Sequence, residues 1–106
     1  MKDASTNVPG YEELMLTLSA AYEQASGGKG KERHARDKPF LKQPIMEIAR
    51  MVGPGYPTGQ AMKKLQEAVG MMEKGNLEAA QAEALGAINY AAAFYILLGE
   101  KRAAQT

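Results

Sequence analysis

The chain has 106 residues, no cysteine and a formal net charge of +1. This length suits a single domain with a modest core, for which self-association is a natural way to bury more surface. Without cysteine, disulfides, thiolate nucleophiles and cysteine-ligated zinc are excluded. The first residues, MKDASTNVPG, lack the apolar core of a secretory signal, so we expect a cytoplasmic protein.

Charge is concentrated in one stretch, SGGKGKERHARDKPFLKQP, residues 26–44. Between Lys29 and Lys42, six cations oppose two acids, a net charge of +4 that leaves −3 for the rest of the chain. A duplex-binding domain usually presents a wider basic face. The local excess therefore favours a small anion or a protein partner over an extended nucleic acid.

The first two helices are predicted on either side of this basic segment. The first begins near Pro9 and ends at Gly27-Gly28, where glycine favours a C-terminal cap. The second begins at Pro44, since proline suits a first helical position, and is stopped by the sequence GPGYP. Apolar residues recur at helical spacing in both helices. They are Tyr11, Leu14, Leu18, Ala21 and Ala25 in the first helix, and Ile45, Ile48, Ala49 and Val52 in the second.

A third helix is expected after Thr58, whose hydroxyl can cap it. Its predicted buried stripe is Ala61, Leu65, Ala68 and Met72, with Lys63, Lys64 and Glu67 on the solvent side.

Gly75 and Asn76 can cap consecutive helices, which predicts an antiparallel helical hairpin. The fourth helix then runs from Leu77 to about Leu98. Residues 1–8 and 100–106 are expected to be flexible, and residues 26–43 to form a loop.

The fourth helix is apolar on every side between Ala84 and Leu98, apart from Asn89. The run is short for a bilayer span, so we expect a buried helix and no membrane. Its small residues would let another helix approach closely, which predicts a homo-oligomer; the alternative is a monomer in which the other helices wrap it. The small residues are Ala84, Gly86, Ala87, Ala91, Ala92 and Ala93. The predicted fold is an all-α, four-helix single domain, 1–106, with a C-terminal hairpin.

The acidic residues argue against metal-dependent catalysis. On the predicted helices no two acids are three or four residues apart, the spacing that lets two carboxylates reach one ion. His34 is the single histidine, so a histidine-rich phosphohydrolase site is also excluded. We therefore predict a non-catalytic protein without metal or cofactor.

The basic segment can form an anion site. It lacks the spacing of a Walker motif, but glycines 27, 28 and 30 can turn backbone N–H groups toward one point. The alternative is a solvated linker. The candidate phosphate ligands are Lys29, Lys31, Arg33 and Arg36, with His34 among them.

A nucleotide would also need a platform for its base. Phe40 and Tyr56 lie in segments that can border a pocket, although each is also a candidate core residue. Asn89 carries an amide that is costly to bury unless it is paired. It either pairs with its own counterpart or another helix, or it reads the polar edge of a ligand.

Four motifs, GGKGKERHA, KPFLKQPIMEIAR, GYPTGQAMKKLQEA and LGAINYAAA, resemble small proteins encoded by tailed bacteriophages. The resemblance covers most of residues 27–98 and implies expression in a bacterial cytoplasm. It brings no active site. By architecture alone the chain is also similar to small helical phage proteins that form symmetric oligomers and sequester cyclic nucleotide signals of host immunity. The preferred hypothesis is therefore sequestration of a nucleotide or cyclic nucleotide. The alternatives are a phage inhibitor of a host protein and a nucleotide pyrophosphohydrolase-like enzyme.

Overall fold

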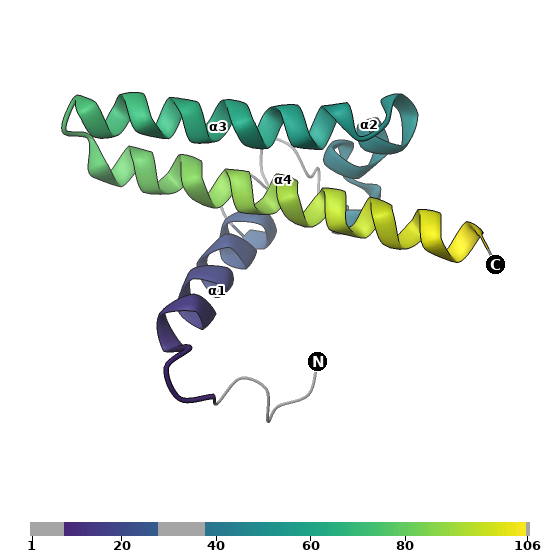
Figure 1. The fold of residues 1–106 in the computed structure, drawn as a ribbon, viewed down its shortest axis with the longest axis horizontal. Coiled ribbons are helices and arrows are strands. Elements are labelled where there is room, and N and C mark those ends of the chain that lie inside the picture. Colours follow the sequence, from purple (N-terminus) through teal and green to yellow (C-terminus); the bar gives the residue numbers. More distant parts are fainter. Residues whose placement is uncertain (1–7, 28–37, 106) are drawn as a thin grey trace.

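The structure, a computed structural model, describes residues 8–27 and 38–105. Within these ranges the regular elements are all helical, which confirms the all-α class. The α-helices are α1 (Glu12–Gly27), α2 (Pro44–Val52), α3 (Gly55–Glu73) and α4 (Leu77–Ala104), and a single 3-10 turn, η3 (Phe40–Lys42), precedes α2. In Figure 1, α3 and α4 lie side by side, α2 lies near the start of α3, and α1 projects from α4.

Two helices, α2 and α4, begin at the predicted residues Pro44 and Leu77, whereas the starts of α1 and α3 differ from the prediction. α1 begins at Glu12, where the Glu12 carboxylate accepts a hydrogen bond from the Gly10 N–H at 3.0 Å. α3 begins at Gly55, so Thr58 lies inside the helix and the prediction that it caps α3 is wrong. Its hydroxyl donates instead to the Pro54 carbonyl at 2.8 Å. Pro57 is tolerated because its missing N–H falls in the first turn.

The turn between α3 and α4 uses the two predicted capping residues. Gly75 has a φ of +81°, the left-handed conformation that glycine adopts without strain. The Asn76 side chain accepts a hydrogen bond from the Ala79 N–H at 3.3 Å, and the Asn76 N–H donates to the Met71 carbonyl at 2.9 Å. These bonds satisfy backbone groups that a helix end would otherwise leave unpaired.

The side of α3 that faces α4 differs from the predicted stripe. Leu65 and Met72, both expected to be buried, are 51% and 53% exposed. Lys64, expected on the solvent side, is half-buried and contacts α4. Five of the positions of α3 that are not fully exposed recur at intervals of three and four residues, as in a helix–helix seam. They are Pro57, Ala61, Lys64, Ala68 and Met71.

α4 is longer than predicted, and most of it is uncovered in the single chain. It continues to Ala104, through residues that were expected to be flexible. It also passes, by length and composition, for a membrane-crossing helix, with a mean hydropathy of 1.3 over its most apolar window. Only 22% of that window is buried, so the described helices do not wrap α4 as the monomer alternative requires. Tyr95, for example, is 78% exposed.

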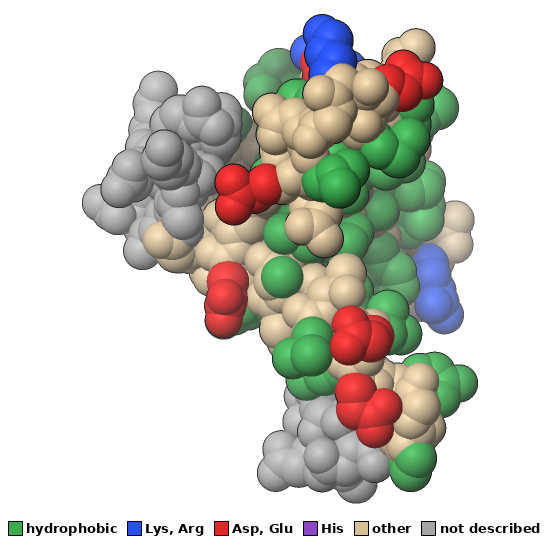
Figure 2. Space-filling model, turned by 90° about the vertical axis from the view of Figure 1, so that its left-hand side faces the viewer, with side chains coloured by type: hydrophobic (Ala, Val, Ile, Leu, Met, Phe, Trp, Pro, Cys, Tyr) green, Lys and Arg blue, Asp and Glu red, His purple; other side chains and the backbone are tan. Residues whose placement is uncertain are grey.

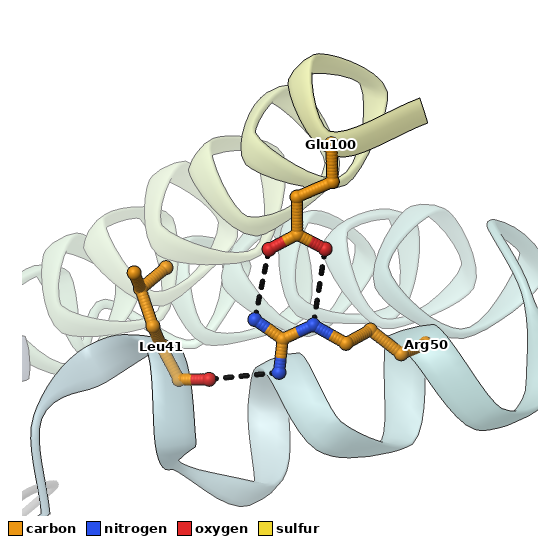
Figure 3. Close-up of polar contacts among 3 residues, drawn as sticks. All are labelled: Leu41, Arg50 and Glu100. Atoms are coloured by element: carbon orange, nitrogen blue, oxygen red, sulfur yellow. Dashed lines mark hydrogen bonds and ion pairs between the residues drawn. The ribbon is translucent and has the colours of Figure 1, made fainter. Parts of the chain in front are cut away.

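An ion pair ties the C-terminal part of α4 to α2 (Figure 3). The Arg50 guanidinium donates to both carboxylate oxygens of Glu100, from Nε at 3.0 Å and from Nη2 at 2.8 Å. Its Nη1 donates to the Leu41 carbonyl in η3 at 2.8 Å. One side chain therefore joins three elements, which helps to explain why α4 stays helical beyond Leu98.

Candidate functional site

Two adjoining cavities lie around the middle of α4. The larger, about 610 Å³, is bounded by α1, η3 and α4 and has a mostly apolar wall that includes Leu18, Ile88 and Ile96. The smaller, about 360 Å³, reaches α3 as well. Four residues line both cavities: Ala25, Phe40, Gln43 and Asn89.

Asn89 joins α4 to α1. Its Nδ2 donates to the Ala21 carbonyl at 3.1 Å and to Gln24 Oε1 at 3.4 Å. Gln24 Nε2 in turn donates to the Ala82 carbonyl at 3.0 Å. A backbone carbonyl can only accept a hydrogen bond, so the amide atom that faces it must be nitrogen. These bonds therefore fix the orientation of the Asn89 and Gln24 amides. The structure therefore shows Asn89 paired with another helix, α1, which is one of the alternatives that the sequence left open.

Gln43 is the most buried polar residue of the described chain, at 9% exposure. Its Nε2 donates to the Lys38 carbonyl at 3.0 Å, so its Oε1 faces away from that bond. Neither this oxygen nor Asn89 Oδ1 has a hydrogen-bond partner among residues 8–27 and 38–105, and none of the fully buried side-chain oxygens there lacks one. Gln43 and Asn89 line both cavities, where their side-chain oxygens can accept hydrogen bonds from a ligand.

Aromatic rings form part of the wall of the smaller cavity. Tyr56 at the start of α3 meets Tyr90 of α4 edge to face, with ring centroids 5.8 Å apart and an interplanar angle of 83°. Burial, with a contribution from Tyr56, raises the pKa of Tyr90 above its usual value. Phe40 adds a third ring.

Lys64 brings a positive charge to the same cavity. Its stem crosses α4 at Gly86, where a Cβ atom would lie 2.7 Å from Lys64 Cδ. Its Nζ is 3.6 Å from Glu83 Oε1, and both side chains are only about a quarter exposed, at 28% and 24%. Any side chain at position 86 would push the lysine away. The glycine thus permits a cation at a helix–helix contact.

Three of the predicted site residues come together in the described chain. Phe40 and Asn89 line both cavities, and Tyr56 lines the smaller one. The remaining five lie outside the described residues: Lys29, Lys31, Arg33, His34 and Arg36. Ser26 and Lys38, close to the two ends of that segment, line the larger cavity.

Sequence reasoning missed five polar or aromatic residues of the smaller cavity, Gln24, Gln43, Lys64, Glu83 and Tyr90. Gln43, Lys64 and Tyr90 belong to motifs on which the resemblance was based, KPFLKQPIMEIAR, GYPTGQAMKKLQEA and LGAINYAAA. These motifs meet at the smaller cavity. The motifs themselves were the signal that could have identified these residues, because motifs far apart in the sequence can contribute to one site.

The described part of the chain contains no group of three histidine or acidic side chains placed to hold a metal ion. What the cavities offer is aromatic surface, the amide side chains of Gln43 and Asn89, and the ion pair of Lys64 with Glu83. Comparison of the chain with protein families, curated proteins and solved structures gave no significant match.

Proposed function

We propose that the protein binds a nucleotide or cyclic nucleotide without transforming it. One observation carries the proposal: Phe40, Tyr56 and Asn89, chosen from distant parts of the sequence, line two adjoining cavities. Nucleotide sites combine apolar surface with a few placed polar groups. These cavities have that composition.

The base would lie in the smaller cavity, against Phe40 or Tyr56. The oxygens of Gln43 and Asn89 would accept hydrogen bonds from it, which favours a base whose edge carries N–H donors. The phosphate would lie toward Lys64 or toward the basic segment between Ser26 and Lys38. The ligands proposed on that segment are Lys29, Lys31, Arg33, His34 and Arg36.

Calorimetric titration at low salt tests the proposal, with linear and cyclic adenine and guanine nucleotides as probes. The double variant K29A/K31A should bind at least about tenfold more weakly, since it removes two phosphate ligands. The matched control is K101A/R102A, which removes the same charge from the last turn of α4. Absence of binding by every nucleotide, or equal loss in both double variants, would refute the proposal.

The biological setting we propose is counter-defence by a bacteriophage, through sequestration of a nucleotide signal in the host cytoplasm. Its basis is the resemblance of the motifs to phage proteins. α4 would act in a homo-oligomer and not in a membrane. Glu83 pairs with Lys64 and Glu100 with Arg50, while Asn89 pairs with α1; insertion of α4 into lipid would separate these polar groups.

A second function is favoured by the exposed apolar surface: inhibition of a host protein by docking of the helices. α1 alone exposes Leu14, Leu16, Leu18 and Tyr22, by 48% or more each. Pull-down from a bacterial lysate should then recover a stoichiometric partner, with or without nucleotide. Incubation with nucleoside triphosphates and magnesium separates both functions from the pyrophosphohydrolase-like alternative, because only that alternative yields products.

A further inference from the structure

We propose that two copies of the chain form a two-fold symmetric dimer through one face of the α3–α4 pair. The outer stripe of α3 in each copy would pack on the small-residue strip of α4 in the other copy. The outer stripe is Met62, Leu65, Val69 and Met72, and the small-residue strip is Ala80, Ala84, Ala87 and Ala91. The inference is independent of the proposed ligand.

The outer stripe of α3 is apolar and uncovered. Its members are 66%, 51%, 50% and 53% exposed, and they recur at intervals of three, four and three residues. These are the intervals of a helix–helix seam. At 3.6 residues per turn the stripe is centred about 100° around the helix from the side that contacts α4. In a four-helix bundle each helix has two neighbours at about this angle, whereas α3 packs mainly on α4 and meets α2 near its start.

The small-residue strip of α4 lies on the same face of the pair. Glu83, Gly86 and Tyr90 mark the side of α4 that contacts α3. The strip is centred about 100° from that side, in the same rotational sense as the outer stripe. In two antiparallel helices, equal rotations in the same sense point to one common face. Figure 2 shows hydrophobic side chains along the right-hand flank, over α3 and α4.

The face is complementary to itself. One half carries Met, Leu and Val side chains, whereas the other half carries alanines: Ala91 is exposed, Ala80 and Ala84 are half-buried, and Ala87 is buried at the edge of the strip. A two-fold axis parallel to the helices places the bulky half of each copy on the small half of the other, as interdigitated packing requires. Lys64 lies level with Gly86 in the chain, so this arrangement sets Leu65 against Ala84 of the partner subunit.

The surface area of the whole chain exceeds that of a compact monomer. The accessible surface is 7984 Å², whereas a compact monomer of 11.4 kDa should have about 5,800 Å². The radius of gyration, 15.0 Å, also exceeds the roughly 13 Å of a compact domain of this length. The excess surface is larger than the roughly 800 Å² that each partner contributes to a standard interface.

Sedimentation and light scattering test the dimer. The wild-type chain should be dimeric at micromolar concentration, and L65E/V69E should be monomeric with its helical circular dichroism retained. A91W should also be monomeric, since it fills the space meant for the partner although position 91 is exposed in the single chain. The matched control, M51E, changes a methionine of α2 that is 78% exposed and should remain dimeric.

Because the chain has no cysteine, disulfide trapping reports the register directly. A mixture of the single variants L65C and A84C should give a disulfide-linked dimer on mild oxidation, and neither variant alone should do so efficiently. A monomeric wild-type chain would overturn the proposal. So would a dimer that persists in both L65E/V69E and A91W, or one in which L65C and A84C fail to cross-link.

Discussion

The Lys64 side chain lies directly against the backbone of Gly86: a Cβ at position 86 would be 2.7 Å from Lys64 Cδ and 3.1 Å from Cε. The contact joins the two helices at the smaller cavity and directs the lysine toward Glu83, 3.6 Å away. A glycine inside a helix costs about 1 kcal/mol relative to alanine. At position 86 the absence of a side chain leaves room for Lys64, so this cost is linked to the placement of the Lys64 ammonium group beside Glu83.

Substitution of Gly86 by alanine should displace Lys64. The gain in helix propensity, up to about 1 kcal/mol, is then offset by loss of a partly exposed ion pair and of side-chain packing. G86A should therefore leave the free energy of unfolding in urea nearly unchanged while it weakens nucleotide binding. The control is G70A, since a Cβ at Gly70 meets nothing within 4 Å and should bring the full gain. Equal stabilisation by G86A and G70A would show that Lys64 is not held in place.

Asn89 should anchor α1. In N89A the Ala21 carbonyl and Gln24 Oε1 both lose their donor, which should cost about 1–3 kcal/mol of unfolding free energy. Amide exchange should accelerate most in α1, because few other polar contacts hold this helix. Q81A removes an exposed amide from the same helix and should change stability by less than about 0.5 kcal/mol. Uniform acceleration over all helices would contradict a local anchoring role.

The helices, and the caps at Gly75 and Asn76, could be predicted because each depends on local chemistry or on periodicity. The inward side of α3 could not. Its apolar residues cover a wide arc, and the predicted stripe falls at the middle of that arc. The chain instead uses one edge of the arc against α4 and leaves Leu65 and Met72 exposed. A prediction based on hydrophobic residues alone cannot identify this side of α3, because the contact with α4 is made by Lys64 packing over Gly86.

The candidate site could be predicted only in part. Phe40, Tyr56 and Asn89 were recognisable because aromatic rings in loops and an amide in an apolar helix are unusual where they occur. Gln43 and Lys64 were not, since one sequence does not show which polar residue of a helix will be turned inward by packing. Their inclusion depends on how α2, α3 and α4 meet, which is information held in the tertiary structure.

Stability at alkaline pH should depend on Tyr90. Burial, with the neighbouring Tyr56, raises the pKa of Tyr90 above its ordinary value of 10.0. A group whose folded pKa is raised contributes stability that is complete below the unfolded pKa and is lost as pH rises above it. The melting temperature of the wild-type chain should therefore fall above about pH 10, and that of Y90F should fall less.

Y95F is the control for this experiment, because Tyr95 lies on the same helix and is 78% exposed. It should follow the wild-type melting curve at every pH. Phenolate absorbance, measured in the same titration, should show one tyrosine fewer with a raised pKa in Y90F. An unchanged alkaline transition in Y90F would show that Tyr90 titrates as it does in the unfolded chain.

The ion pair between Arg50 and Glu100 should contribute stability at neutral pH that disappears in acid. The Arg50 guanidinium holds the pKa of the Glu100 carboxyl below its ordinary value of 4.5. A depressed folded pKa gives stability that is present above the unfolded pKa and is lost as pH falls through the folded pKa. E100Q should therefore melt below the wild-type chain at pH 7, and the two melting temperatures should converge below about pH 4.

Two further variants assign this effect to the pair itself. R50K keeps the charge but loses the forked geometry and the bond to the Leu41 carbonyl, so it should be destabilised at both pH values. E67Q removes an exposed acid of α3 and should follow the wild-type chain throughout. Added salt should reduce the E100Q difference, because both side chains are more than a third exposed. A difference between E100Q and wild type that persists unchanged in acid would mean that Glu100 stabilises α4 by packing and not by its charge.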